Sequence, residues 1–204
     1  MLQRHSRRPH LKTGDSRGQA LVEFCLVIMV FLTIFTGLIE FGVAFAVEMQ
    51  VSFASRDAAT LASEAGGATA TADCATLNRI DQDLFAPATR SKISEVDIFW
   101  ATATGSVKSG AIERYTPGGT LCLGWGGWTN TLNLYPASSR CASISGSTLG
   151  LCLTGHSGPD KIGVSIIYPY AWSTPLPGLI GLSGTGFTFT QTNLVVMEPI
   201  PVLQ

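Results

Sequence analysis

The segment that decides the fold is residues 20–47, which read ALVEFCLVIMVFLTIFTGLIEFGVAFAV. Between Glu23 and Glu40 this segment contains sixteen consecutive residues without a charge. As an α-helix with a rise of 1.5 Å per residue, the segment would be about 42 Å long, whereas the hydrocarbon core of a bilayer is about 30 Å thick. The chain is therefore predicted to cross a membrane once, over about residues 20–47, and no later segment is apolar enough for a second crossing.

Charges on the two sides of this segment predict its orientation. Residues 1–18 contain five basic residues and one acidic residue, whereas the other side begins with Glu48, Arg56 and Asp57. The positive-inside rule places the basic side in the cytoplasm and exports the remainder of the chain. A cleaved secretory signal peptide is the alternative, because Ala44–Ala46 has the A-x-A pattern of a cleavage site. The apolar run is, however, longer than the roughly 7–15 residues of such peptides.

The composition excludes several other classes of protein. Of the 204 residues, 46% are hydrophobic and 13% are charged, and the net charge is −1. Disordered chains combine low hydrophobicity with high net charge, and nucleic-acid-binding domains present a basic surface. Because neither description fits this chain, we expect an apolar anchor followed by one small domain, and no nucleic-acid partner.

The helical pattern continues beyond the predicted membrane segment. Small and apolar residues recur at helical spacing as far as Gly66 and Gly67. These residues are Ala54, Ala58, Leu61, Ala62 and Ala65. One helix over residues 19–66, about 70 Å long, is therefore predicted, with its small-residue stripe packed against a partner helix or against the protein's own domain. Glu40 and Glu48 are expected to reach headgroups or water at the outer end of the membrane segment.

The remainder of the chain completes an α+β fold class. Residues 67–90 are predicted to be a linker and one short helix, with Asp73 as its cap and Pro87 as its stop. The apolar positions of this helix are Leu77, Ile80, Leu84 and Phe85. From residue 91 onward, segments rich in β-branched and aromatic residues predict strands at 94–103, 161–172 and 186–199. Residues 91–204 are thus expected to form a small, antiparallel, β-rich exported domain.

Four cysteines in the exported part predict disulfide bonds, since that compartment is oxidising. They are Cys74, Cys122, Cys141 and Cys152. Of the three possible pairings, we prefer Cys74–Cys122 with Cys141–Cys152, because the second bond would close a short Ser/Gly-rich loop. A metal site with Cys152 and His156 is the rival, but the close paired spacings of metal sites are missing, so no metal or other cofactor is expected. Cys25, in the membrane segment, is expected to be an inert small hydrophobe.

The exported part offers no convincing catalytic residues. His156 is its only histidine and stands among turn residues, which favours a surface-loop imidazole. Ser157 is not in a G-x-S-x-G motif, so a triad with Asp160 is a remote alternative. Trp125 and Trp128 either close the core of the domain or stack on a sugar, and the core role is favoured because small cores depend on aromatic residues. We therefore predict that the protein is not an enzyme.

Residues 17–24, RGQALVEF, resemble the processing region of type IV prepilins, in which a basic leader ends in glycine and a glutamate is the fifth residue after the cut. The run GQALVEF, followed by an apolar helix, the stretch IEFG and an alanine-rich continuation, is similar in particular to TadE-like proteins, the pseudopilins of tight-adherence (Flp) pilus systems. Residues 164–170 and 196–199 are also similar to the tail of that family. The resemblance implies that residues 1–18 are a leader, that a prepilin peptidase cuts between Gly18 and Gln19, and that Glu23 pairs with the new N-terminal amine of a neighbouring subunit.

The leading functional hypothesis follows from this resemblance. It is a structural protein of a bacterial Tad pilus, a minor pilin or pseudopilin that acts by helix packing in the cytoplasmic (inner) membrane or in the extracellular pilus. The implied partners are the membrane, the prepilin peptidase, other pilin or pseudopilin subunits and the pilus assembly platform. The alternative is an adhesin-like or carbohydrate-binding domain on an uncleaved anchor. A mature chain that starts at Gln19 favours the first hypothesis, and an intact Met1 favours the second.

Overall fold

The computed structural model describes residues 16–65, 71–122, 127–142, 156, 158–175, 178, 181, 184 and 186–197. Within these residues the chain forms two α-helices, two short 3₁₀-helices and five strands. In chain order they are α1 Ser16–Ala65, α2 Ala72–Asp83, η1 Arg90–Lys92, β1 Glu95–Ala101, β2 Val107–Leu121, β3 Trp128–Asn133, η3 Ala137–Ser139, β4 Lys161–Ala171 and β5 Gly186–Val196.

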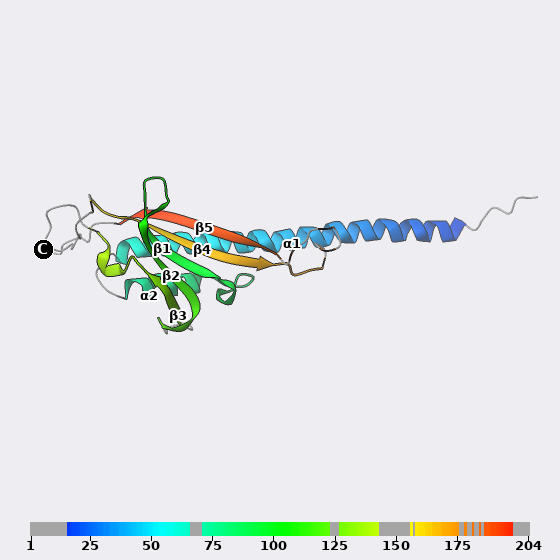
Figure 1. Cartoon of the computed structure of the whole chain (residues 1–204). Helices are drawn as coiled ribbons and strands as arrows, with labels where there is room; N and C mark the ends of the chain where they lie inside the picture. The colour runs from blue at the N-terminus through cyan, green and yellow to red at the C-terminus, as the bar shows by residue number, and fades with distance from the viewer. Residues whose placement is uncertain are drawn as a thin grey trace, which may run out of the picture.

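Helix α1 is continuous over 50 residues and has two environments along its length. Its first half projects as an isolated rod, and its second half lies along the sheet (Figure 1). The helix contains a window that is long and apolar enough to cross a membrane, and none of that window is buried. No proline or paired glycine interrupts α1, so the backbone hydrogen bonds of the apolar half continue directly into the half that carries the domain.

The five strands form one antiparallel sheet with the order β3-β2-β1-β4-β5. The central strand β1 pairs with β2 on one side and with β4 on the other, and β4 pairs with β5 along its whole length. The predicted strands 94–103, 161–172 and 186–199 correspond to β1, β4 and β5, whereas the sequence pattern did not predict β2 and β3. The predicted fold class, a long N-terminal apolar helix followed by a small antiparallel domain, is confirmed.

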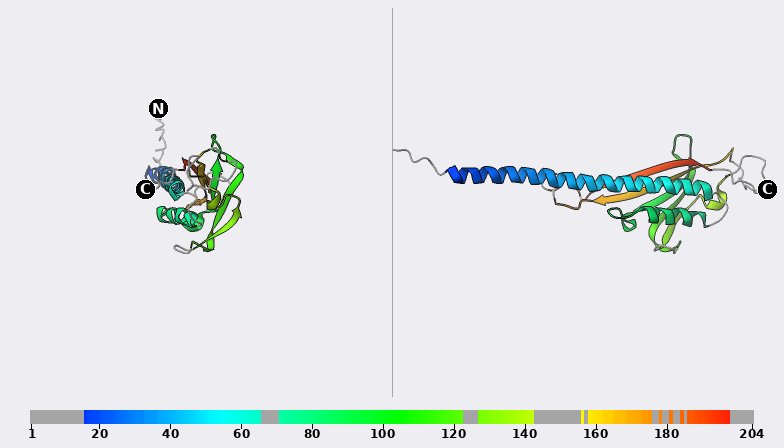
Figure 2. Two further views of the ribbon diagram at one scale, coloured as in Figure 1. Left: turned by 90° about the vertical axis from the view of Figure 1, so that its left-hand side faces the viewer. Right: turned by 180° about the vertical axis from the view of Figure 1, so that it is seen from behind.

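The core lies between one face of this sheet and the two helices, which lie side by side in the end-on view (Figure 2). Alternate residues of β4 face the helices, because successive side chains of a strand point to opposite faces. The fully buried positions include Ile162, Val164 and Ile166 of β4, Val51, Ala54 and Ala58 of α1, and Leu77 and Ile80 of α2. The small-residue stripe of α1 thus packs against the protein's own domain, which was one of the two expected alternatives.

Helix α2 differs from its prediction at both ends. Its N-cap is Thr71, which makes no side-chain capping hydrogen bond. The prediction of Asp73 as the cap is wrong, because Asp73 lies inside the first turn and its carboxylate is bound by a buried arginine. At the other end the helix stops at Asp83, and Phe85, predicted as an apolar helix position, is 65% exposed in the following loop.

Candidate assembly site along the long helix

The predicted processing site lies near the start of α1. Helix α1 begins at Ser16, so Gly18, Gln19 and Glu23 lie in its first turns, and all three residues are exposed. Among the residues that the structure describes, none forms a hydrogen bond or an ion pair with Glu23. The carboxylate therefore lies on the apolar part of the helix. Its pairing with the amine of a neighbouring subunit stays a prediction.

Glu40 is the first buried residue along α1. Its side chain is 3% exposed, and its Oε1 accepts hydrogen bonds from the Tyr170 hydroxyl at 3.0 Å and from the backbone N–H of Ser173 at 2.7 Å. The expectation that Glu40 reaches headgroups or water is therefore wrong, because donors at the end of β4 replace the water. Glu48 is half-buried and accepts a hydrogen bond from Gln191 Nε2 at 3.3 Å.

Further polar contacts fix α1 to β4 and β5 within the core. The Ser55 hydroxyl lies 2.9 Å from the carbonyl oxygen of Val164, to which it donates. Asn193 Nδ2 donates to Ser55 Oγ at 3.1 Å and to the carbonyl oxygen of Ser52 at 3.4 Å. Buried polar groups are stable only when they are paired, and each such pair is formed in one position of the helix along the sheet. These contacts therefore set the axial register of α1 against the domain.

The outward side of α1, opposite Glu40, keeps large apolar side chains well beyond this first contact. We call Phe45, Met49 and Phe53 the outer stripe; their exposed fractions are 62%, 59% and 57%. They follow one another at i, i+4 spacing, so they form one row along the helix surface. The same side becomes polar only from Arg56 onward. The row therefore continues the apolar surface of the membrane segment into the half of α1 that carries the domain.

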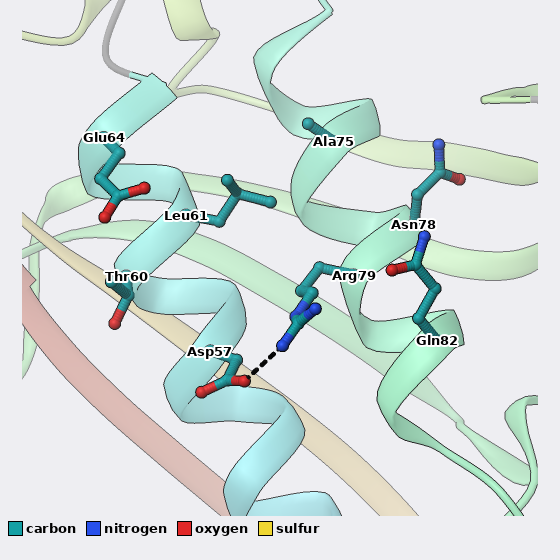
Figure 3. A pocket seen from close by; sticks show the side chains of 8 residues that line it. All are labelled: Asp57, Thr60, Leu61, Glu64, Ala75, Asn78, Arg79 and Gln82. Carbon is teal, nitrogen blue, oxygen red and sulfur yellow. Dashed lines mark hydrogen bonds and ion pairs between the residues drawn. The ribbon is translucent and has the colours of Figure 1, made fainter.

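A groove of about 570 Å³ separates the distal ends of α1 and α2 (Figure 3). Figure 3 shows Arg79 of α2 pointing across the groove toward Asp57 of α1, and their closest N–O distance is 2.8 Å. Arg79 also lies 3.1 Å from Asp83 one turn further along α2. Both ion pairs are exposed to solvent, which screens them, and the first of them connects α2 to α1 across the groove.

A buried charge network connects α2, β2 and the loop after η3. Arg140 Nη1 lies 2.6 Å from Asp73, and its Nη2 lies 2.7 Å from Glu113. Tyr115 donates to the second Asp73 oxygen at 3.1 Å. Burial, together with the adjacent Asp73 carboxylate, raises the pKa of Glu113 to about 8, although Arg140 opposes the shift. The raised pKa of Glu113 reduces the negative charge that this buried network holds around Arg140.

His156 is held in a second network and does not lie freely on the surface. Its Nδ1 is 2.5 Å from Asp160 Oδ1, and its ring stacks on Trp100 with centroids 4.2 Å apart. The other Asp160 oxygen accepts hydrogen bonds from the Tyr135 hydroxyl at 2.7 Å and from the Cys141 N–H at 2.9 Å. The expectation of a surface-loop imidazole is wrong. The carboxylate that would belong to a triad instead connects three loops, and Ser157 lies outside the described residues.

One of the two preferred disulfides is present: Cys74 at the start of α2 is bonded to Cys122 at the end of β2. Cys152 lies outside the described residues, so the Cys141–Cys152 pairing and the rival metal site with His156 stay predictions. Cys25 is a free thiol on the exposed half of α1. The disulfide fixes α2 to the sheet on the same side as the Arg140 network.

Trp128 closes the core, as the favoured interpretation of the tryptophan pair predicted. It is fully buried, its indole N–H donates to Asp81 at 3.2 Å, and the Arg90 guanidinium lies 4.8 Å from its ring centroid. Trp125 lies outside the described residues. A side chain in this position is not available for stacking on a ligand.

The amino-acid sequence did not predict that Glu40, Arg140 and Asp160 are buried and form the polar contacts described above. A signal was present for the last two, because residues 116–199 contain only four charged residues and these are two of them. A charged side chain is almost never fully buried unless it is paired, and Arg140 and Asp160 were two of the few charges in this segment that could pair. Glu40 gave no such signal, since its partners lie 130 and 133 residues away.

Comparison with known proteins gives one match. Comparisons with curated proteins and with solved structures found no significant similarity. The family model that matches is described as TadE-like protein and covers residues 18–60, from the predicted cleavage position to the part of α1 that packs on the sheet. Such a match suggests a protein associated with Tad pili. The N-terminal region of the chain is thus TadE-like, as its GQALVEF motif predicted.

Proposed function

We propose that the protein is a membrane-anchored structural component of a Tad (Flp) type pilus, a TadE-like minor pilin or pseudopilin that works by helix packing. The observation that carries the proposal is the match over residues 18–60 to a helix that has two faces. One face packs on the protein's own sheet from Glu40 onward, and the other remains apolar and exposed as far as Phe53. The second face is available for the helix of a neighbouring subunit.

The outer stripe supports this proposal energetically. A fully buried Phe or Met side chain contributes about 1.5–3 kcal/mol relative to an exposed one, so covering three of them is worth several kcal/mol. Within the membrane the same benefit is missing, because lipid tails are as apolar as the side chains. Contacts made by Phe45, Met49 and Phe53 therefore favour association of the exported halves of the helices, and they persist if subunits are extracted from lipid into a filament.

Processing would act as an assembly switch at the other end of the helix. Cleavage after Gly18 removes the basic leader and creates an α-amino group next to the membrane segment. A carboxylate in lipid is costly unless it is paired, and Glu23 of one subunit can pair with the new amine of another. The partners in this scheme are the prepilin peptidase, other pilin or pseudopilin subunits and the assembly platform. The leader stays in the cytoplasm, and the domain is exported across the inner membrane.

N-terminal sequencing of the mature protein tests processing. A chain that starts at Gln19 supports the proposal, whereas an intact Met1 favours an uncleaved anchor that carries an adhesin-like domain. The variant Glu23→Ala is expected to insert and be processed normally but to be poorly recovered in sheared pilus material. Recovery equal to that of the wild type would contradict the pairing.

Cysteine crosslinking tests helix packing. In a Cys25→Ala background, Val22→Cys beside Glu23 and Met49→Cys in the outer stripe are expected to crosslink to a neighbouring subunit and so to identify it. Thr60→Cys is the matched control, because Thr60 is exposed on the polar end of the same side. Crosslinking of Met49→Cys that does not exceed that of Thr60→Cys would contradict packing through the stripe.

A further inference from the structure

The exposed part of α1 has the length of one membrane crossing. From Gln19 to Ile39 no residue is buried, and Glu40 is the first buried residue of the helix. These 21 residues span about 32 Å at 1.5 Å per residue, close to the roughly 30 Å of a hydrocarbon core. The exposed segment therefore fits one crossing that ends at Ile39, and Glu40, Ala44 and Val47, which follow it on one side of the helix, are buried.

This geometry fixes the height of the domain above the membrane. Glu40 is bonded to Tyr170 and Ser173, so α1 cannot slide further into the lipid without carrying the end of β4 with it. A carboxylate in the hydrocarbon core is costly, which opposes that movement. The end of the sheet that contains Tyr170 and Ser173 must then lie at the membrane surface.

The side chains at this end are aromatic. We call Phe41, Tyr170, Trp172, Phe187 and Phe189 the aromatic cluster. Trp172 contacts Phe41 and Phe187 with ring centroids 6.2 and 5.1 Å apart, and Phe187 contacts Phe189 at 4.7 Å. Phe41 and Phe187 are among the exposed large apolar residues. In residues 38–43, 170–175 and 186–189, which build this end, Glu40 is the sole Asp, Glu, Lys or Arg, and it is buried.

We propose that the aromatic cluster lies in the headgroup region of the outer leaflet and that the exported domain is thereby a membrane-contacting domain held at a fixed height. Tryptophan is enriched at this depth because its ring has an apolar body and a polar edge, and Trp172 is the half-buried member of the cluster that fits this description. The absence of exposed charge among the described residues of this end removes the desolvation cost of contact with lipid. The inference rests on the proposed membrane span and adds a second lipid contact, made by β4 and β5.

Depth-dependent fluorescence quenching tests this inference on the full chain, reconstituted in vesicles of phosphatidylethanolamine and phosphatidylglycerol. In a Cys25→Ala background, Ser173→Cys carries an NBD label at the aromatic cluster, and Ser106→Cys carries it at the opposite end of the sheet. Both serines are exposed, and Ser173 contacts Glu40 through its backbone. Lipids with a headgroup nitroxide are expected to quench the label at position 173 and not at 106. Equal quenching at the two positions would overturn the inference.

A label on native Cys25 separates this inference from the span on which it rests. Cys25 should be quenched by lipids with a nitroxide in the acyl chain. If it is quenched but position 173 is not, the span holds and the contact of the cluster is wrong. If Cys25 is not quenched, the span is wrong and the inference falls with it.

A pair of variants tests whether the aromatic side chains themselves make the contact. Trp172→Ser with Phe187→Ser should reduce quenching at position 173. Phe85→Ser is the control, because Phe85 is a 65% exposed aromatic residue in the loop after α2, near Ala88, whose N–H bonds to Gln50 about 15 Å beyond Glu40 along α1, and it should leave quenching unchanged. Undiminished quenching in the Trp172→Ser, Phe187→Ser protein would overturn the role of the cluster.

Discussion

Replacing Glu113 with glutamine is expected to remove most of a pH dependence that this residue gives to the stability of the domain. Glu113 is 2% exposed, lies 2.7 Å from Arg140, and has a pKa raised to about 8 by burial and by Asp73. In the unfolded chain its pKa returns to the ordinary value near 4.5. Between these two values the folded state holds a proton that the unfolded state has released. The free energy of unfolding therefore decreases as pH rises through this window.

The magnitude follows from the two pKa values. Each pKa unit corresponds to about 1.4 kcal/mol, so the Glu113 contribution falls by nearly that amount per pH unit between about pH 5.5 and pH 7, and less steeply on either side. The total loss approaches about 5 kcal/mol above pH 8, a large part of the stability of a domain of this size. Below about pH 3.5 both states are protonated and the contribution no longer changes. Glutamine reproduces the protonated carboxyl, since its amide donates to Asp73 while its oxygen accepts from Arg140.

Guanidinium unfolding of the full chain in detergent micelles, followed from pH 4 to pH 9, measures this slope. We subtract the free energy of unfolding of Glu113→Gln from that of the wild type at each pH. The difference isolates the contribution of Glu113, because burial also raises the pKa values of Asp81 and Asp83 but these residues contribute equally to both proteins. A difference that is flat with pH, or that favours the wild type at high pH, would refute the reasoning. Either result would mean that Arg140 keeps Glu113 ionised in the folded state.

Three further perturbations follow from the packing. Ala58→Leu should lower the free energy of unfolding by about 1–3 kcal/mol in the same assay, because Ala58 is fully buried between helix and sheet. Cys74→Ser with Cys122→Ser should cost about 4 kcal/mol, since the bond closes a 48-residue separation, and a reducing agent should then have no further effect through this bond. Gly163→Ala should destabilise the sheet by a similar 1–3 kcal/mol, because its methyl group would overlap the Phe99 ring, and Phe99→Ala should relieve that overlap.

Much of the helical half of the protein was predictable, because its signals are local. The apolar run, the spacing of Ala54, Ala58 and Ala62, and the paired glycines at 66 and 67 act through the helix itself. The strands at 94–103, 161–172 and 186–199 were predictable for the same reason. In contrast, β2 carries Gly110, Pro117, Gly118 and Gly119, so its composition indicates turns, and only pairing with β1 and β3 makes it a strand.

The candidate site also has parts that the local sequence predicts and parts that depend on distant residues. Gly18, Gln19 and Glu23 belong to one contiguous motif, so the amino-acid sequence alone was enough to indicate the family. The end of the membrane segment at residue 47 stays a prediction, because apolar residues 41–47 suit lipid and a protein core equally well. The assignment of Asp73 as a cap failed because its charge was matched by Arg140, which is distant in sequence.

The sequence by itself determined that this protein has one long apolar helix, a TadE-like N-terminal region and a small β-rich domain that is poor in charge. These properties depend on neighbours within a few turns or on composition alone. Only the tertiary structure decided that the alanine stripe packs on the protein's own sheet, that Glu40 is held by Tyr170 and Ser173, and that aromatic rings gather where the helix emerges from the domain. Each of these depends on side chains more than a hundred residues apart, whose hydrogen bonds and van der Waals contacts exist only after β4 and β5 have paired along α1.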